Sequence, residues 1–306
     1  MSLALLFPGQ GSQYVGMGQD LANTYTVADQ TFKEADDILG FQLSRLAWQG
    51  PEEELLLTKN AQPAILTHSV AVFRIISELL DVKMAAGHSL GEFSAHVAAG
   101  TFDFTDALSA VRLRGELMYS AGKVRRGTMA AVIGMDNEAV VSICEQASTQ
   151  SEICTPANFN SPGQIVISGD TSSIKRAMQL AYDNGASKVV ELKVSGAFHS
   201  PLMLPSEDGL RSHFKKINFN DPRYPIVSNV TSGPVTSGTE ACDLLIRQLT
   251  SPVRWAESVS HMVDSGVEKF LEIGPGSVLR GLNRKNARGI PCISLGGCAD
   301  LDTWKA

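Results

Sequence analysis

The sequence predicts an α/β fold in which a small ferredoxin-like subdomain interrupts a larger domain. The length of 306 residues, with 43% hydrophobic and 19% charged residues, suits one large globular domain with an insertion. A short apolar strand over 82–86 runs directly into a glycine-rich turn and then a helix. Strand and helix patterns then alternate as β-α-β-α-β between residues 124 and 194, which favours the ferredoxin-like arrangement.

Before the insertion, apolar residues recur with strand or helix spacing in several segments. These are predicted strands over 1–7 and 82–86, and predicted helices over 61–80, 92–99 and 105–118. The first segment ends at the turn-forming pair Pro8-Gly9, and Gly100 is suited to cap the helix before it. The N-terminal segment is too short for a signal peptide and lacks a basic start, so we expect a core strand.

The insertion has its own pattern of strands and helices. The predicted strands are 128–134, 164–168 and 187–194, and the predicted helices are 137–146 and 172–184. A ferredoxin-like unit usually has four strands, whereas the pattern predicts three. The run 123–127 is the expected way into the insertion, and Ser195-Gly196 the way out. We therefore predict a large catalytic subdomain from 1–124 and 195–306, and a small subdomain from 125–194.

Charge and composition exclude several classes of function. The net charge of −6 and the pI of about 5.6 leave no basic excess for binding a nucleic-acid backbone. No apolar run reaches the roughly 20 residues that span a bilayer. The five cysteines are odd in number and lack CxxC spacing, so we expect reduced thiols. We expect a monomeric cytoplasmic protein that binds neither nucleic acid nor membrane.

The pentapeptide Gly87-His88-Ser89-Leu90-Gly91 has the form Gly-x-Ser-x-Gly between a predicted strand and a predicted helix. In this setting the serine occupies a strained, exposed turn, and glycines on either side let neighbouring backbone come close. The helix N-terminus favours developing negative charge. We interpret Ser89 as the nucleophile of an acyl-transfer reaction. The alternative is a glycine-rich helix start in which Ser89 only caps the helix.

A serine nucleophile needs a base, and the six histidines differ in their reach toward Ser89. His96 lies further along the same predicted helix, roughly 10 Å away at about 1.5 Å per residue. His88 is adjacent but projects differently from the turn. His199 lies on a loop after the alternating strand 188–194, where catalytic groups are commonly presented, so we expect it to be the base. The other histidines lie within helical patterns: His68, His213 and His261.

The loop 9–13, Gly-Gln-Gly-Ser-Gln, follows the first predicted strand. It is similar to the start of a dinucleotide-binding Gly-x-Gly-x-x-Gly, but the third position is Tyr14 and no acidic residue closes a second strand further on. We interpret it as a tight loop beside Ser89, with the backbone N–H groups of Gln10 and Leu90 forming an oxyanion hole. No HExxH or other paired-ligand spacing indicates a metal site.

Seven motifs stand in the order and at the intervals of one enzyme family. They are Phe7 to Gln13 (FPGQGSQ), Gly87 to Glu92 (GHSLGE), Arg112 to Gly115 (RLRG), Asn158 to Gln164 (NFNSPGQ), Gly196 to Pro201 (GAFHSP), Gln248-Leu249, and Glu272 to Gly276 (EIGPG). In these motifs the chain resembles the malonyl-CoA:acyl carrier protein transacylases over nearly its whole length. Seven matches in order are a specific signal.

The resemblance implies an α/β-hydrolase-like core with a parallel sheet, interrupted by a ferredoxin-like subdomain, in agreement with the predicted insertion. It implies Ser89 as nucleophile and His199 as base, with the backbone carbonyl of Gln248 orienting the His199 ring. A neutral carbonyl stabilises an imidazolium less than a buried carboxylate does. Geometry must therefore supply much of the activation.

Arg114 is the residue that separates a malonyl transferase from an esterase. Arg112 and Arg114 are two positions apart on a predicted helix and roughly 200° apart around it, so only one can reach the pocket. The family motif assigns this role to Arg114, whose guanidinium would hold the malonyl carboxylate bidentately. Without the resemblance, Arg114 would be interpreted as a solvated helix charge.

The resemblance also implies contacts to the acyl group and the thioester. Phe198 and Leu90 match the malonyl-selective pattern of the family, because their bulk crowds the carbon between the two carbonyls. One extra methyl group is worth only about 1 to 3 kcal/mol in a hydrophobic pocket, so this selectivity is a tendency. Asn160 is expected to line the thioester channel or, alternatively, to bond its own turn before Ser161 and Pro162.

The predicted activity is a ping-pong transfer of malonyl from malonyl-CoA to the phosphopantetheine thiol of acyl carrier protein, through a malonyl-serine ester. Coenzyme A enters as part of the substrate and phosphopantetheine belongs to the carrier, so no cofactor or metal is expected. The carrier would serve fatty acid synthesis, with a free-standing transferase of a polyketide synthase as the alternative. A serine thioesterase and a non-catalytic docking module for carrier protein are the other hypotheses.

Carrier proteins of this kind are acidic, so a basic patch is expected on the surface despite the negative total charge. One candidate lies at the start of the insertion and the other near the C-terminus. The candidate residues are Lys123, Arg125, Arg126, Arg280, Arg284, Lys285 and Arg288. A solvated charged face is the alternative for both.

Overall fold

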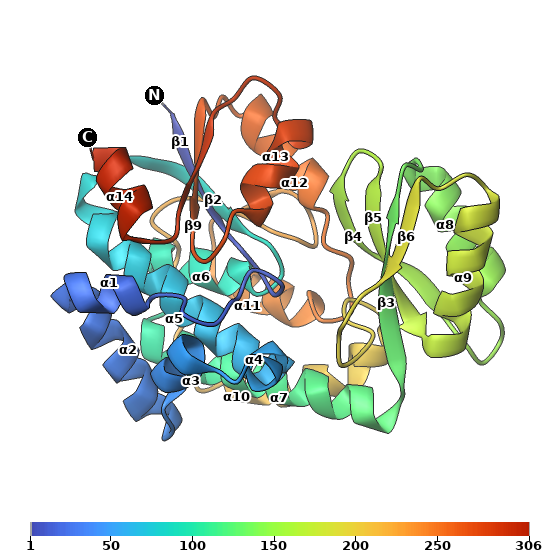
Figure 1. Ribbon diagram of the computed structural model, residues 1–306, viewed down its shortest axis with the longest axis horizontal. Coiled ribbons are helices and arrows are strands. Elements are labelled where there is room, and N and C mark those ends of the chain that lie inside the picture. Colours follow the sequence, from blue (N-terminus) through green and yellow to red (C-terminus); the bar gives the residue numbers. More distant parts are fainter. Residues whose placement is uncertain (1, 306) are drawn as a thin grey trace.

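The computed structural model describes residues 2–305 and contains a mostly parallel sheet and a smaller antiparallel sheet, which confirms the predicted fold class (Figure 1). The large sheet has the strand order β10-β9-β1-β2-β7-β8, and only β8 runs antiparallel to its neighbour. Its strands are β1 (Leu3–Phe7), β2 (Val82–Gly87), β7 (Ile226–Val227), β8 (Pro234–Val235), β9 (Lys269–Ile273) and β10 (Cys292–Leu295).

Helices surround this sheet on both faces (Figure 1). Those before the insertion are α1 (Gln19–Thr24), α2 (Thr26–Leu39), α3 (Leu43–Gln49), α4 (Glu52–Leu56), α5 (Thr58–Ile76), α6 (Gly91–Ala99) and α7 (Phe104–Val124). Those after it are α10 (Glu207–Phe214), α11 (Gly238–Arg247), α12 (Trp255–Asp264), α13 (Val278–Asn286) and α14 (Cys298–Lys305). Two 3₁₀ turns cover Ser77–Leu79 and Pro201–Ser206.

Different helices cover the two faces of the sheet because successive side chains of β1 point to opposite faces. Leu3, Leu5 and Phe7 pack in the core cluster that includes residues of α2, α5 and α6. Ala4 and Leu6 pack in a second cluster with residues of α12 and α13. Every residue of β1 is buried, which explains why this strand is apolar throughout instead of alternating.

The insertion forms the antiparallel sheet β4-β5-β3-β6, and α8 and α9 pack on one face of it (Figure 1). Its elements are β3 (Gly127–Ile133), α8 (Asn137–Ala147), β4 (Cys154–Ser161), β5 (Gln164–Asp170), α9 (Thr171–Asp183) and β6 (Lys188–Glu191). The chain order β-α-β-β-α-β is the ferredoxin-like one. The subdomain boundaries at 125 and 194 stay a prediction.

The prediction of three strands in the insertion missed β4. This strand includes Pro156, and its pairing with β5 shifts register between Pro156 and Asn158 and again between Phe159 and Ser161. Register shifts break the alternation of buried and exposed residues from which a strand is predicted. Asn160, which was expected on a loop, lies in β4.

Several predicted bounds also differ from the structure by a few residues, among them that of the helix predicted over 61–80, which is Thr58–Ile76. The helix predicted over 105–118 extends to Val124, and the strand predicted over 187–194 ends at Glu191. Residues 192–194 thus form a loop beside the cavity described below. The first strand begins at Leu3, and Met1 lies outside the described residues.

Candidate active site

Ser89 lies just beyond the C-terminal end of β2, at the side of the large sheet where the parallel strand β1 also ends. Phe7 pairs with Gly87, so the loop after β1 and the turn after β2 are neighbours. Ser89 has a φ of 51°, the strained left-handed conformation typical of a serine in such a turn. A Cβ on Gly87 would lie 1.8 Å from the carbonyl carbon of Gly91, and one on Gly91 2.0 Å from the Phe7 carbonyl oxygen. The turn therefore requires both glycines.

Asn229, just after β7, fixes the backbone of this turn. Its Oδ1 accepts a hydrogen bond from the Ser89 N–H at 2.7 Å, and its Nδ2 donates to the Gly87 carbonyl at 2.7 Å. Strand β7 lies next to β2 in the sheet, which places the side chain against the turn. Asn229 was not predicted from the sequence, because both of its partners in the turn lie far away along the chain.

His199 lies against Ser89, with Nε2 2.7 Å from the Ser89 Oγ. Its Nδ1 is 2.9 Å from the carbonyl oxygen of Gln248 and 3.2 Å from that of Ser251. Carbonyl oxygens only accept hydrogen bonds, so the proton of a neutral ring is on Nδ1. Nε2 then carries a lone pair toward Ser89 and can accept its proton.

The environment of His199 keeps the ring neutral. Burial, and after it the charge of Arg114, lowers the pKa of His199 from its usual 6.5 to about 3. His199 itself has a φ of 57°, and the neighbouring Ser200 hydroxyl donates to the Ala197 carbonyl at 2.7 Å. This bonded turn holds the ring in position on a segment that has no regular secondary structure.

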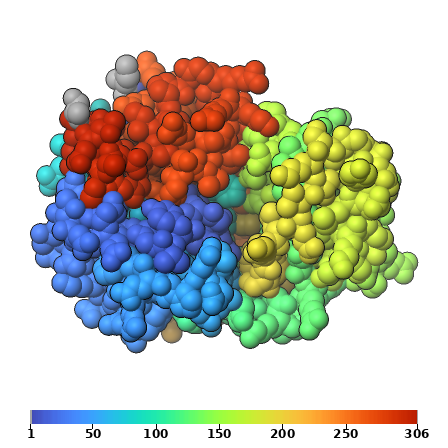
Figure 2. Space-filling view, in the orientation of Figure 1, coloured from blue at the N-terminus to red at the C-terminus, as the bar shows by residue number. Residues whose placement is uncertain are grey.

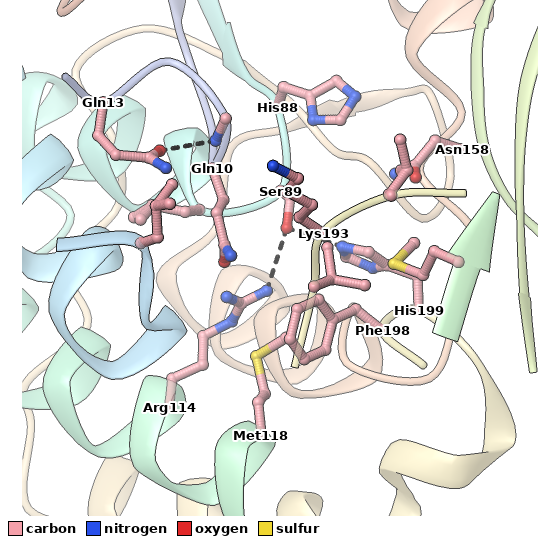
Figure 3. A pocket seen from close by; sticks show the side chains of 16 residues that line it. Gln10, Gln13, His88, Ser89, Arg114, Met118, Asn158, Lys193, Phe198 and His199 are labelled. Carbon is pink, nitrogen blue, oxygen red and sulfur yellow. Dashed lines mark hydrogen bonds between the residues drawn. The ribbon is translucent and has the colours of Figure 1, made fainter. Parts of the chain in front are cut away.

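Arg114 extends from α7 to the other side of Ser89 (Figure 3). Its Nη2 lies 3.2 Å from the Ser89 Oγ and 2.9 Å from Oε1 of Gln248, and its Nη1 lies 2.6 Å from Oε1 of Gln62. The side chain is 1% exposed, and its Nε has no partner among the described residues. The guanidinium also lies over the Phe93 ring. A buried cation thus lies beside the hydroxyl, and two of its five N–H donors, that on Nε and one on Nη1, are not used by any described residue.

Arg112 faces elsewhere, as its position on the helix predicts. Its Nη1 donates to the Lys59 carbonyl and to the Asn60 side chain, both at 2.8 Å. Its Nε pairs with Glu116 at 2.7 Å. Only Arg114 of the two arginines reaches the cavity beside Ser89.

The backbone N–H groups of Gln10 and Leu90, at the same edge of the sheet, donate no hydrogen bond to another residue within 2–305. Leu90 immediately precedes α6. The Gln10 side chain is held by Thr58, whose hydroxyl donates to Oε1 at 2.8 Å. Free donors on two adjoining loops are suited to an oxyanion, as the sequence analysis expects.

These groups line a cavity of about 270 Å³. On one side lie the loop after β1 and residues of α4, and on the other side Leu192, Lys193 and Val194. Figure 2 shows this face of the molecule hollowed between the blue N-terminal part and the yellow part of the insertion. The hollow gives an elongated substrate a route to Ser89.

Comparison with known proteins identifies the family of this site. The family described as acyl transferase domain matches residues 4–295. The chain belongs to this family. The malonyl CoA-acyl carrier protein transacylase of Haemophilus influenzae is 44% identical over 302 residues, which is 98% of this chain and 96% of that protein. The resemblance drawn from the motifs is confirmed.

Solved structures agree with the acyl transferase assignment. An acyl carrier protein S-malonyltransferase from Vibrio cholerae has a TM-score of 0.95 and 43% identity, covering 99% of this chain and 100% of that one. A malonyl-transacylase in complex with a type II PKS acyl-carrier protein has a TM-score of 0.96 and 43% identity, covering 99% and 98%. These neighbours share both the parallel sheet and the inserted antiparallel sheet.

Asn160 of the acyl transferase bonds His88 and Asn286. Phe198 and Leu90 line the cavity, whereas Asn160 is not among the lining residues. Its Oδ1 lies 2.8 Å from Nε2 of His88, and its carbonyl accepts from Asn286 at 2.8 Å. Asn158, two residues earlier on β4, lines the cavity. That Asn160 lines the thioester channel stays a prediction.

The remaining histidines of the acyl transferase lie away from Ser89. His96, on α6, bonds Thr101 just beyond the end of that helix at 2.9 Å, and the other three lie in helices as predicted. Within residues 2–305, no group of three or more His, Cys, Asp or Glu side chains could hold a metal ion. No helix in the same range is long and apolar enough to cross a membrane.

Proposed function

We propose that this acyltransferase moves a malonyl group from malonyl-CoA to the phosphopantetheine thiol of an acyl carrier protein. The observation that carries the proposal is the buried Arg114 guanidinium 3.2 Å from the Ser89 hydroxyl. In a malonyl thioester, the carboxylate is separated from the reacting carbonyl by one methylene group. A cation this close to the nucleophile can bind a carboxylate that is one methylene group away from the reacting carbonyl. An uncharged acyl group would offer it no charge to pair with.

The first half-reaction acylates Ser89. The malonyl carboxylate is held by Arg114, and the Ser89 oxygen attacks the thioester carbonyl while His199 Nε2 takes its proton. The backbone N–H groups of Gln10 and Leu90 hold the negative charge that develops on the carbonyl oxygen. The C–S bond breaks, the proton on His199 passes to the departing coenzyme A thiolate, which leaves as the thiol, and a malonyl-serine ester remains.

The second half-reaction reverses these steps with a different thiol. The carrier's phosphopantetheine thiol gives its proton to His199 Nε2 and attacks the ester, and Ser89 leaves with that proton. Gln248 and Ser251 orient the ring through their carbonyls, and no carboxylate shares the charge. Coenzyme A and phosphopantetheine belong to the substrates, so the protein itself uses no cofactor. We further propose that it acts as a cytoplasmic monomer.

The carrier we propose is that of fatty acid synthesis. A polyketide carrier is the alternative, because a similar transacylase has been solved with a type II PKS acyl-carrier protein. Intact mass spectrometry after mixing with malonyl-CoA tests the acylation: one malonyl group should be added and then lost when carrier is supplied. Parallel incubation with a fatty acid carrier and a polyketide carrier identifies the acceptor. Folded protein that gains no malonyl group would contradict the proposal.

Neutral His199 predicts a particular pH dependence. Because the pKa of His199 lies near 3, the ring stays in its basic form far below pH 6.5. A neutral sulfonyl fluoride, which does not need Arg114, should inactivate the enzyme at about the same rate at pH 5.5 and pH 7.5. With an unshifted pKa, about nine-tenths of the base would be protonated at pH 5.5. A tenfold lower inactivation rate there would contradict the prediction.

The two basic patches expected to meet an acidic carrier differ in whether their charges are paired with acidic residues. Arg125 in the first patch pairs with Asp170, whereas Arg284 and Lys285 on α13 form no ion pair or side-chain hydrogen bond with a described residue. Reversing both charges (Arg284→Glu, Lys285→Glu) should raise the KM for carrier about tenfold and leave acylation by malonyl-CoA unchanged. Lys123→Glu is the matched control in the first patch. An equal rise in that control would contradict the assignment to α13.

A further inference from the structure

The charge of Arg114 is stabilised without a carboxylate in contact with it. Its guanidinium donates to two amide oxygens, those of Gln62 and Gln248, and to the Ser89 hydroxyl. A buried cation is costly unless polar groups compensate it. Amide oxygens do this without neutralising the charge, so a substrate carboxylate can still gain a full ion pair.

An acidic side chain lies close to Arg114 but does not contact it, because one other side chain lies between them. Glu92, on α6, is 1% exposed, and its Oε2 accepts from Gln248 Nε2 at 2.7 Å and from the Asn229 N–H at 3.2 Å. Burial raises the pKa of Glu92 to about 7, while the bond from Gln248 and the charge of Arg114 act in the opposite direction. Glu92 does not line the cavity.

Glu92 determines which end of the Gln248 amide faces Arg114. The Glu92 Oε2 accepts from the Asn229 backbone N–H and is therefore an acceptor, so the Gln248 Nε2 points to it and also donates to the Ser89 carbonyl at 2.9 Å. The Oε1 is then left for the Arg114 Nη2 at 2.9 Å. With the amide reversed, its N–H donors would oppose the N–H donors of the guanidinium, and Arg114 would lose this contact.

A purely local role does not explain Glu92. Ser89 and Glu92 have the spacing of a capping box, in which the Glu side chain accepts from the backbone N–H of the capping residue. Here that N–H, on Ser89, donates to Asn229 instead. The carboxylate turns away from its own helix end toward Gln248.

We propose that Glu92 is a positioning residue of the site that holds the acyl carboxylate. Acting through the Gln248 amide, it fixes the Arg114 guanidinium beside Ser89 and leaves its charge unpaired for substrate. A glutamate in direct contact with Arg114 would compete with the malonyl carboxylate, and the intervening amide prevents this. The inference rests on the proposed malonyl transfer.

The Glu92→Leu variant tests this role because it removes both acceptor oxygens and keeps roughly the size of the side chain. The ratio of kcat/KM for malonyl-CoA to kcat/KM for acetyl-CoA should fall about tenfold, because the Gln248 amide loses its acceptor and no longer fixes Arg114, while Ser89 and His199 remain. The matched control is Glu272→Leu, at another buried carboxylate, which accepts from the N–H groups of Leu279 and Arg280 away from the cavity. This control should leave the ratio unchanged.

A second variant makes the test independent of how well Glu92→Leu folds. Gln248→Leu keeps the backbone carbonyl for His199 but removes the amide, so it should lower the same ratio. The double variant should lower it no further, because Glu92 acts through Gln248. Equal losses with both substrates, or additive losses in the double variant, would overturn the inference.

The same experiments separate this inference from the proposed function. If wild-type protein gains a malonyl group and the Glu92→Leu variant has the same malonyl-to-acetyl ratio as wild type, only the role of Glu92 is removed. Wild-type protein that gains no malonyl group removes the proposed function and the role of Glu92 with it.

Discussion

The Ser89→Ala variant is expected to gain no malonyl group and to lower kcat/KM for transfer by a factor of about 10³ or more. Without the hydroxyl there is no atom to carry the acyl group, and the ping-pong route is closed. His199 and the free N–H groups remain, so a small residual rate can persist through activation of a thiol or water. Intact mass spectrometry and steady-state kinetics with carrier measure the two effects.

Ser94→Ala is the matched control for this variant. Ser94 lies on α6, the helix that begins at the last glycine of the turn. It is fully buried, and its hydroxyl has no partner among the described residues. Its removal costs no hydrogen bond, so malonyl addition should persist in this variant. A malonyl adduct of normal yield on Ser89→Ala would show that another residue is the nucleophile.

Ser89, the proposed nucleophile, could be singled out from the sequence because its signal is local. Strand, turn and helix follow one another within 82–99, and the glycines that the turn requires are part of the same few residues. His199 was predictable for a similar reason, since it follows an alternating strand on a loop. The predicted fold rests on the same kind of short-range periodicity, and it failed at β4, where register shifts interrupt the alternation.

The supporting residues were not predictable because their contacts join distant parts of the chain. The bond between the Ser89 N–H and Asn229 spans 140 residues, and that between Gln248 and Glu92 spans 156. Nothing in the local pattern around Asn229 or Gln62 indicates a partner. Gln248 as the group that orients His199 came only from the family resemblance, because a backbone carbonyl leaves no mark on residue type.

Replacing Arg114 with alanine is expected to lower kcat/KM for malonyl-CoA by about 10² or more and to affect acetyl-CoA far less. The malonyl carboxylate would enter a buried site without its cation, and the desolvation of that charge would no longer be compensated. Acetyl-CoA has no such charge, and its reaction needs only Ser89, His199 and the free N–H groups. Acylation rates with each thioester, measured by coenzyme A release, give the two values.

Arg112→Ala is the control on the same helix, because Arg112 bonds Lys59, Asn60 and Glu116 away from the cavity. It should leave the ratio of malonyl to acetyl acylation unchanged. Arg114→Lys should fall between alanine and wild type, since an ammonium keeps the charge but cannot bind a carboxylate bidentately. Equal losses with both thioesters in Arg114→Ala would instead mean that Arg114 serves Ser89, whose hydroxyl it also contacts at 3.2 Å, and not the acyl group.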